Sequence, residues 1–403
     1  MNLNFWPKMY YSGGGGGGGG GDAGGGGGGG YGGGGAGGSG GGYGGGAGTG
    51  GIGAGGGSSD EKLPKGSTPA GAFRFNNDSR LLEYWNGNEW VNVTTTTPDI
   101  LTGGTRGIFM GGESPSRIDV IEFITLNSTG NAGDFGDLTQ SVSRGAAVGS
   151  RTRGIRGRGS TPSYTDTIDF ITIAQFGDAT DFGDSTVSTH TSGALSDATR
   201  GVFFGGYNPS SSQVIDYITI ASTGDAVDFG DMVAPINRIC GFASPVRGII
   251  GGGSYASPSP ATGASKNIQY INIQAKGNAV DFGNLTKTKF QFQGSANAVR
   301  GVFGGGRTAT PADDGETDDD MDYITIATLG DAIDFGDMST GNRIRTAGAS
   351  SETRGTISGG GPSLTDIIDY FEFASIGDMI DFGDLTASKQ NNMGLSNGHG
   401  GLG

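Results

Sequence analysis

The sequence predicts an all-β protein whose larger part is a β-propeller of six blades. Three observations carry this prediction: one unit recurs six times, the copies are about 47 residues long, and each copy holds short β-rich runs separated by Gly, Pro, Ser, Asn and Asp. Runs divided in this way are typical of strands and tight turns. Such a unit cannot bury its apolar face alone and must stack on its neighbours. A four-stranded unit of this length fits one propeller blade.

The copy that begins at Arg200 shows the unit most clearly. Its first run ends in a Gly-Gly pair, and its second run, residues 215–220, is apolar on both faces except at Asp216 and Thr219. A strand that is covered on only one face would alternate between apolar and polar residues. The second run is therefore predicted to lie between two packed sheets.

The third run of this copy turns at residues 228–231, and a weaker fourth run follows over residues 236–242. The spacing of the copies is measured by the Phe of the third run, which recurs at intervals of 47, 47, 53, 53 and 47 residues, at Phe135, Phe182, Phe229, Phe282, Phe335 and Phe382. The longer intervals come from extra residues at 254–267 and 307–320, between the Gly-Gly pair and the second run. Homologous loops leave a propeller on the same side, so both insertions are expected to enlarge one face.

The order of features in each copy resembles the kelch repeat. An Arg-containing run leads to a strand ending in Gly-Gly, and then come a loop, a strand with an aromatic residue, and an aromatic residue near the next turn, as in residues 235–252 and beyond. The resemblance spans about residues 100–403 and implies a kelch-like propeller. The Trp of the kelch pattern is Phe in every copy.

The last residues of the chain repeat the fourth run and the start of a seventh opening run, at 391–401. We expect this terminal run to lie beside residues 105–112 and to fasten a ring of six blades. An open stack, or a seventh blade supplied by residues 70–100, is the alternative.

The bulk composition argues against several classes of partner. The net charge of −15 and the pI of about 4.5 argue against nucleic acid and anionic membranes. A single cysteine, Cys240, excludes an intrachain disulfide framework and a cysteine-rich metal site. No run approaches the roughly 18 apolar residues of a membrane span, so no membrane insertion is expected. The first residues are too polar and too short for a signal peptide.

The sequence does not indicate an enzyme. The two histidines, His190 and His399, lie in no nucleophile motif, and acidic residues recur at equivalent positions of the copies, which is typical of a structural role. The Gly-Gly pairs end strands and do not open a helix as a nucleotide-binding glycine fingerprint does. We therefore expect no catalytic and no cofactor-binding residues.

Residues 1–12 are expected to form an N-terminal docking segment. Phe5, Trp6, Tyr10 and Tyr11 cannot form a core beside a glycine tract. Aromatic anchors dominate many interfaces, and disordered tails are usually poor in them. A disordered terminus is the alternative.

Residues 13–60 are expected to be a glycine-rich spacer, because 35 of the 45 residues at 13–57 are glycine. Glycine in bulk costs too much backbone entropy to fold locally, so a flexible linker is one interpretation. The other is a bundle of extended strands of polyproline-II type packed side by side. In composition the tract resembles the glycine-rich tip adhesins of some tailed phages.

Residues 61–99 are predicted to hold a small β-meander. Asn86-Gly87 lies between alternating apolar runs, which is the strongest short hairpin signal. A meander of this size is marginal alone and should pack on something. The stretch 70–93, with its Arg74-Phe75-Asn76 and Trp90, resembles a small module that recurs in phage tail-fibre and appendage proteins. The resemblance implies a virion context.

The acidic turn of the third run is the most conspicuous repeated feature. It places Asp or Asn at every third residue around a Gly. Such carboxylates can ligate Ca²⁺, but Asx side chains also close tight turns on their own backbone, which is the preferred interpretation. The candidate calcium ligands are Asp178, Asp181, Asp184, Asp225, Asp228 and Asp231. The acidic insertion at 313–320 is expected to be a solvated loop, with a cation site or partner contact as the alternative.

An arginine opens each copy, and an acidic residue recurs in the second run. We expect these residues to form ion pairs within or between blades, with an anion-binding ring on the propeller axis as the alternative. The arginines are Arg106, Arg153, Arg200, Arg247, Arg300 and Arg354, and the acidic residues are Asp119, Asp169, Asp216, Asp322 and Asp369, with Gln269 in the fourth copy.

Together these features predict a non-enzymatic virion structural protein, a tail-fibre or tip component on the exterior of a phage tail or capsid. It is expected to be a homo-oligomer that attaches to other virion proteins through its N-terminus and presents the propeller to a host-surface glycan or protein. The alternatives are a capsid decoration or head-fibre protein, a glycan-acting enzyme on a propeller, and a cellular kelch-like adaptor. An active-site pair confined to one blade would mark the enzyme, and the sequence shows none.

Overall fold

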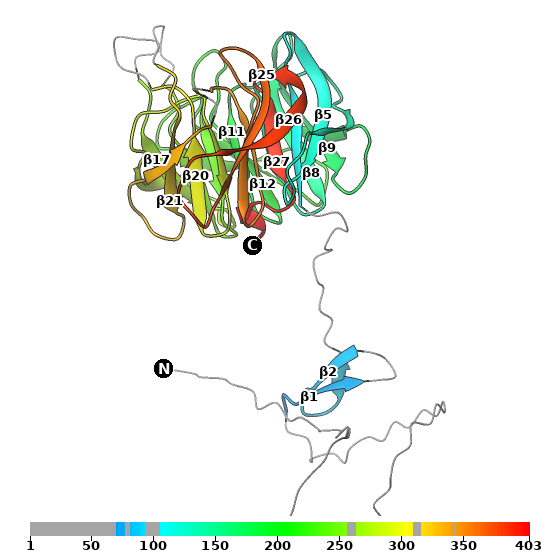
Figure 1. Ribbon diagram of the computed structural model, residues 1–403. Helices are drawn as coiled ribbons and strands as arrows, with labels where there is room; N and C mark the ends of the chain where they lie inside the picture. Colours follow the sequence, from blue (N-terminus) through cyan, green and yellow to red (C-terminus); the bar gives the residue numbers. More distant parts are fainter. Residues whose placement is uncertain are drawn as a thin grey trace, which may run out of the picture. The chain divides into compact units, whose positions relative to one another are not determined.

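The computed structural model describes residues 70–76, 81–92, 105–255, 263–308, 316–339, 341 and 343–403. The chain divides into two units, Met1–Thr97 and Pro98–Gly403. The described residues are strands, turns and one short 3-10 helix, η1 (Gly400–Leu402), and none of them is in an α-helix (Figure 1). The expected all-β class is therefore confirmed. The expected docking segment and glycine-rich spacer, residues 1–60, lie outside the described residues.

The first unit holds an antiparallel sheet of three strands in the order β1 (Phe73–Asn76), β2 (Leu81–Trp85) and β3 (Trp90–Asn92). The turn between β2 and β3 is closed by Asn86, whose side-chain oxygen accepts hydrogen bonds from the amides of Asn88 and Glu89. Gly87 takes a φ of 99°, which favours glycine. The predicted meander and its Asn-Gly turn are present.

Glu83 connects the residues that carry the resemblance to the phage module. Its carboxylate accepts hydrogen bonds from Arg74 Nε at 2.7 Å and from Asn76 Nδ2 at 2.9 Å. The Arg74 guanidinium lies 4.4 Å from the ring centroid of Trp90, which in turn stacks on Trp85. The cross-strand contacts thus explain why these residue types occur together in so short a sheet.

The described part of the second unit contains six four-stranded antiparallel sheets. From the innermost strand outwards, the first three are β27 (Met393–Ser396), β4 (Arg106–Glu113), β5 (Arg117–Thr125) and β6 (Gly133–Asp137); β7 (Ala146–Gly149), β8 (Arg153–Ser160), β9 (Tyr164–Thr172) and β10 (Thr180–Asp184); and β11 (Gly193–Ser196), β12 (Arg200–Phe204), β13 (Val214–Thr219) and β14 (Val227–Asp231). The other three are β15 (Cys240–Ala243), β16 (Arg247–Gly251), β17 (Asn267–Asn272) and β18 (Val280–Asn284); β19 (Gln293–Ala296), β20 (Arg300–Gly304), β21 (Asp320–Thr325) and β22 (Ile333–Asp337); and β23 (Ala347–Ser350), β24 (Arg354–Ser358), β25 (Thr365–Glu372) and β26 (Ile380–Lys389).

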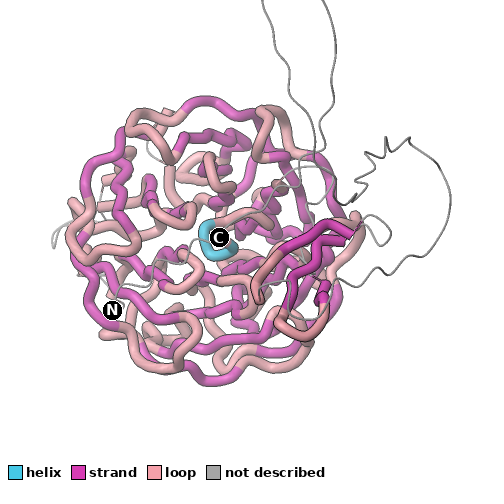
Figure 2. Tube along the Cα trace, turned by 90° about the horizontal axis from the view of Figure 1, so that it is seen from below, coloured by secondary structure: helices cyan, strands magenta, loops and turns pink. Residues whose placement is uncertain are grey.

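The sheets are arranged around a central axis in a propeller-like manner (Figure 2). The fourth run of each copy is the innermost strand of the following sheet, so the terminal run supplies β27 to the sheet of β4. This strand pairs with β4 from Met393 opposite Met110 to Ser396 opposite Gly107. The terminal run therefore lies beside residues 105–112, as predicted. Each innermost strand contacts the next one around the axis, and β27 contacts β7.

The third strand of each sheet packs against both neighbouring sheets. In β13, the buried Ile215 belongs to a hydrophobic cluster with Ile250 and Ile271 of the following sheet. Ile218 belongs to a different cluster, with Ile155 of the preceding sheet. The strand is thus apolar on both faces because both faces are covered, which confirms the position predicted from its pattern.

Buried ion pairs lie at the third strand; those of Asp216 and Glu122 join neighbouring sheets, whereas Asp169 pairs with Arg156 of its own sheet. Five sheets have a buried carboxylate at equivalent positions, and each carboxylate contacts one buried cation: Glu122 with Lys389, Asp169 with Arg156, Asp216 with Arg158, Asp322 with Lys289, and Asp369 with Arg343. The remaining sheet has Gln269, which accepts a hydrogen bond from the Val233 amide at 2.8 Å. The position that is equivalent to Lys389 and Lys289 is occupied here by the buried Ile236. In this copy both the cation and the carboxylate are therefore replaced by uncharged residues.

These contacts correct the expected ion pairs of the opening arginines. Arg200 lies opposite Thr219 while Asp216 lies opposite Phe203, so the two side chains are separated along the strands. Glu122, and not Asp119, is the first-copy equivalent of Asp216.

Each opening arginine instead binds a backbone carbonyl of the next copy. Arg200 Nη1 donates to the carbonyl of Ile273 at 2.9 Å, and its guanidinium lies 4.8 Å from the ring centroid of Tyr217. The same pair of contacts recurs at the other copies, for Arg106, Arg153, Arg247, Arg300 and Arg354. The aromatic residue of the second run therefore orients a cation that connects neighbouring sheets.

The acidic turns also join neighbouring sheets. The Asp384 amide donates to Asn131 Oδ1 at 3.1 Å, and the Gly130 amide donates to the carbonyl of Phe382 at 2.8 Å. Equivalent side-chain contacts are made by Asp178, Asp225, Asn278, Asp331 and Asp378. The first Asp or Asn of each turn was expected to close the turn on its own backbone. This is wrong, because its side-chain oxygen accepts a hydrogen bond from a backbone amide of the preceding copy. Gly383 has a φ of 146°, and a Cβ there would lie 2.6 Å from the Gly130 carbonyl.

Candidate functional site

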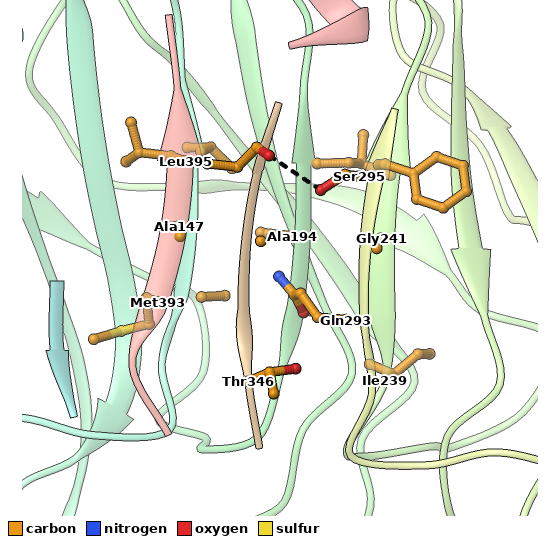
Figure 3. A pocket seen from close by; sticks show the side chains of 18 of the residues that line it. Ala147, Ala194, Ile239, Gly241, Gln293, Ser295, Thr346, Met393 and Leu395 are labelled. Carbon is orange, nitrogen blue, oxygen red and sulfur yellow. Dashed lines mark hydrogen bonds between the residues drawn. The ribbon is translucent and has the colours of Figure 1, made fainter. Parts of the chain in front are cut away.

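The six innermost strands enclose a channel along the axis of the second unit, here called the axial channel (Figure 2). It is lined by residues 144–149 and by the equivalent residues of the other five copies (Figure 3). The room inside it for water-sized molecules is about 150 Å³. This is below the range of about 300–1,000 Å³ for small-molecule sites, so the channel is narrow.

The two ends of the channel lie on different faces of the unit. The plugged face carries the turns between the first and second strands, Thr105 and the C-terminus; a Cβ on Gly398 would lie 2.3 Å from Thr105. The open face carries the loops between the second and third strands, which include the two insertions between β16 and β17 and between β20 and β21. The described ends of the insertions therefore share one face, as the spacing of the copies predicts.

Residues at the C-terminus close the channel at the plugged face. Figure 2 shows η1 at the centre of the ring of sheets, and a Cβ on Gly400 would lie 2.3 Å from the carbonyl oxygen of Asn297. His399 Nε2 lies 2.8 Å from the carbonyl oxygen of Gly149, and its Nδ1 accepts a hydrogen bond from the Gly401 amide. Burial lowers the pKa of His399, so the ring is a neutral bridge between β7 and η1.

A serine contacts this histidine without forming a nucleophile–base pair. Ser196 Oγ lies 3.2 Å from His399 Nε2. That nitrogen must carry its hydrogen to donate to Gly149, so it cannot take the proton of the serine. The carboxylate of Asp197 accepts from the amides of Thr199 and Arg200. The contact between Ser196 and His399 therefore holds the C-terminal residues in place.

At the open face the channel is bounded by six residues at equivalent positions, here called the mouth ring. Each lies two residues before its innermost strand and has a left-handed backbone, with φ between 53° and 61°. The amide of each residue donates to the carbonyl of the preceding one at 2.7–3.1 Å, and the first donates to the last. The mouth ring is thus joined by six backbone hydrogen bonds, through Arg144, Thr191, Arg238, Gln291, Arg345 and Asn391.

Arginine occupies every second position of the mouth ring, as Arg144, Arg238 and Arg345. The pKa of Arg345 is lowered by burial and by the positive charges of Arg144, Arg307 and Arg238. The pKa of His190, one residue before the ring, is lowered to about 4 by burial and by the charges of Arg144, Arg238 and Arg117. Positive charge is therefore concentrated at the open end of the channel, although the protein has a net charge of −15.

The acidic residue Glu113 contacts this basic cluster. Its carboxylate lies 3.3 Å from Arg144 Nη2 and accepts hydrogen bonds from Ser143 Oγ at 2.9 Å and from Asn391 Nδ2 at 3.0 Å. Burial opposes ionisation, but these contacts outweigh it and lower the pKa of Glu113. Glu113 thus fixes the first and last copies at the mouth and offsets part of the charge of Arg144.

Buried polar atoms without a hydrogen-bond partner gather at the mouth ring. Ser192 Oγ, Thr346 Oγ1 and both amide atoms of Asn392 are among them, on residues that directly follow members of the ring. Their side chains are only 6–7% exposed. Gln291 Oε1, in the ring itself, is also without a partner. Leaving such a group unpaired costs about 1–3 kcal/mol, so these atoms favour water or a polar ligand.

Aromatic side chains lie beside the mouth ring on the open face. The ring of His190 stacks between Tyr164 and Tyr207, with centroid distances of 4.9 and 5.7 Å. Tyr164 is 37% exposed. Tyrosines of this kind present a rigid apolar face together with a polar edge, which suits them to binding surfaces.

The candidate calcium ligands lie on the rim and do not line the channel. Asp178 Oδ1 and Asp225 Oδ1 each accept a hydrogen bond from a backbone amide of the preceding copy. The pKa of Asp184 is raised by partial burial and by the charges of Asp166, Asp225 and Asp181. Within the described residues, these carboxylates form no group of three with oxygens within 4.8 Å of one another. Calcium binding by Asp178, Asp181, Asp184, Asp225, Asp228 and Asp231 stays a prediction.

Asp318, Asp319 and Asp320 do place their carboxylates within 4.8 Å of one another, at the described end of the acidic insertion. Lys287 Nζ lies 3.4 Å from Asp318 and also contacts Asp320. The pKa of Lys287 is raised by its hydrogen bond to Asp320. A lysine of the chain itself therefore offsets part of the negative charge of this cluster.

The sequence reasoning did not find the mouth ring. The aromatic residues of the expected docking segment, Phe5, Trp6, Tyr10 and Tyr11, lie outside the described residues. The opening arginines lie on the second strands and do not line the channel, so they do not form the alternative ring on the axis. The missed signal is an arginine just before the fourth run in alternate copies, at Arg144, Arg238 and Arg345.

No protein-family model matches the chain, and no curated protein is found to match it. No helix among the described residues is long and apolar enough to cross a membrane.

Proposed function

We propose that the second unit is a closed six-bladed propeller of kelch type. Three contacts between the first and last copies support closure: the pairing of β27 with β4, the ion pair of Glu122 with Lys389, and the amide of Arg144 bound to the carbonyl of Asn391. The six equivalent sheets and their Arg–aromatic contacts support the kelch-like repeat, with Phe in place of the kelch Trp. A closed ring leaves no sheet face uncovered at a first or last copy, which favours it over an open stack.

We further propose that the protein is a non-enzymatic virion structural protein, a tail-fibre or tip component that presents the open face to the host surface. The observation that carries this proposal is the difference between the two faces. Thr105 and the C-terminus lie on the plugged face, whereas the open face carries the mouth ring, the aromatic cluster and both insertions. A unit held from one face and exposing loops on the other is suited to attachment.

The virion context is supported by the resemblance of residues 70–93 to the phage appendage module. Under this proposal the N-terminal segment binds other virion proteins, and the assembly is homo-oligomeric on the exterior of the phage.

The test is immunoelectron microscopy of virions with an antibody against residues 100–403. Labelling of the tail tip or fibres is the expected result. Labelling of the head would assign the protein to a capsid decoration or head fibre, and a lack of labelling on every virion part would overturn the proposal. Binding of the full-length chain to host cells, measured in parallel, tests attachment itself.

A further inference from the structure

We propose that the mouth ring binds the carboxylate of an acidic sugar, whose hydroxyls are bound by the unpartnered polar groups at the ring. The inference rests on the proposed function for its biological role, and it names the chemical class of the surface glycan. Four features of the mouth support it: its charge, its hydrogen-bonding groups, an aromatic wall and a single entrance.

The charge at the mouth favours an anion. Arg144, Arg238 and Arg345 alternate around a ring whose backbone is fixed by six hydrogen bonds, and all three residues line the channel. Arg117 and Arg307 add positive charge on the same face, and Glu113 offsets one cation. Planar guanidinium groups bind carboxylates in a bidentate manner, which lysine cannot do.

The hydrogen-bonding groups favour a ligand that also carries hydroxyls. Gln291 Oε1 and Asn392 Oδ1 are buried acceptors that require a donor, and Asn392 Nδ2 is a buried donor that requires an acceptor. A carboxylate alone supplies acceptors only. A sugar hydroxyl supplies both a donor and an acceptor, so an acidic sugar can match groups of both kinds. Thr346 Oγ1 and Ser192 Oγ, on the residues that follow other ring members, can bind further hydroxyls.

The aromatic cluster forms a wall for the same ligand. Tyr164, His190 and Tyr207 lie next to the ring, and burial together with the nearby arginines lowers the pKa of His190 to about 4, so its ring is neutral at pH 7. Neutral aromatic faces cover the apolar C–H surface of a sugar, while the tyrosine hydroxyls remain in contact with solvent.

The ligand can enter from the open face alone. At the plugged face, η1 and His399 close the channel. Between the two ends, the innermost strands share one position that is always Ala or Gly: Ala147, Ala194, Gly241, Gly294, Gly348 and Gly394. A Cβ on Gly394 would lie 2.2 Å from the Gly348 carbonyl oxygen of the neighbouring strand. Neighbouring inner strands are therefore in close contact, and the closed plugged face makes the channel a dead-end cup, suited to one terminal or branching sugar.

The experiment is calorimetric titration of the full-length protein with a glucuronic acid oligosaccharide and with the glucose oligosaccharide of the same linkage. The acidic oligosaccharide is expected to bind, with an affinity that falls as salt is raised, because exposed charges are screened. Arg345→Gln and Arg238→Gln are each expected to weaken binding about tenfold, and Arg345→Lys less than Arg345→Gln. Lys276→Gln removes an exposed cation from the opposite face and should leave binding unchanged.

Three results would overturn the inference: equal binding of both oligosaccharides, no binding of either, or competition by inorganic phosphate at the concentration at which the acidic oligosaccharide competes. Thermal unfolding of each variant shows whether a loss of binding reflects a loss of fold. If full-length protein binds host cells and no acidic sugar, only the ligand class is wrong. If it neither binds cells nor labels virions, the proposed function is wrong as well.

Discussion

The ammonium of Lys389 lies 2.6 Å from the carboxylate of Glu122, which precedes it by 267 residues, and both side chains are buried. At the equivalent place in another copy the chain has Ile236 and Gln269, which are also buried and carry no charge. The two arrangements show that the position tolerates a pair of charges or none. A buried charge without its partner is far more costly than either.

Lys389→Ile is therefore expected to lower the free energy of unfolding by about 3–5 kcal/mol, because Glu122 is left buried and unpaired. Adding Glu122→Gln copies the natural pair of Ile236 and Gln269 and should recover most of the loss. Urea denaturation of the full-length protein measures both values. A double variant as unstable as the single one would contradict this account of the pair.

Gly383→Ala is expected to destabilise the protein more than Gly377→Ala. Both glycines have positive φ, 146° and 151°, so both substitutions strain the backbone. At Gly383 a Cβ would lie 2.6 Å from the Gly130 carbonyl of the next copy, whereas nothing lies within 4 Å at Gly377. Overpacking adds about 1–3 kcal/mol at the first position. Equal losses in thermal unfolding would show that the close approach between copies is not limiting.

Arg200→Lys is expected to destabilise the fold by about 1–2 kcal/mol although it keeps the charge. The guanidinium both donates to the carbonyl of Ile273 and lies over Tyr217, and an ammonium on a flexible stem does not reproduce this geometry. Lys266→Arg, at an exposed site, is the matched control and should be neutral. Unfolding midpoints in urea give the comparison, and a neutral Arg200→Lys would assign the contact no net stabilisation.

His190 makes stability depend on pH in acid. Its pKa is lowered from 6.5 to about 4 by burial and by nearby arginines. Between these two values the unfolded chain binds a proton that the native chain does not, so stability falls as the pH falls. His190→Gln should remove this part of the slope, at most about 3 kcal/mol, with less expected because the ring is partly exposed. Urea denaturation across this range checks it, and an unchanged slope would contradict the prediction.

The repeat was predictable because strands that are covered on both faces leave a strong pattern. Residues 215–220 are apolar except at Asp216 and Thr219, and both faces of β13 prove to be buried by neighbouring sheets. The partners of the charged residues were not predictable from spacing alone. Arg200 and Asp216 lie on paired strands, but their register separates them, and the cation for Asp216 comes from Arg158 of the preceding sheet.

The candidate site depends on backbone hydrogen bonds between copies, which the pattern of residue types in the sequence does not reveal. Arg144, Arg238 and Arg345 are scattered in the chain, and their neutral counterparts Thr191, Gln291 and Asn391 share no residue type with them. What they share is a left-handed backbone and one hydrogen bond to the next copy. A backbone property of this kind is visible in the sequence only when glycine marks it, as at Gly383.

The position of Thr105 beside the C-terminal residues determines how a pulling force would act on the second unit. Tension applied through the preceding chain enters at the start of β4, along the length of the strand. Since β4 is hydrogen-bonded to β27 on one side and to β5 on the other, all of its bonds are loaded at once in shear. Resistance to forced unfolding is set by the unfolding rate under load, so the pairing of β4 with β27, the first and last strands of the second unit, is also its mechanical clamp.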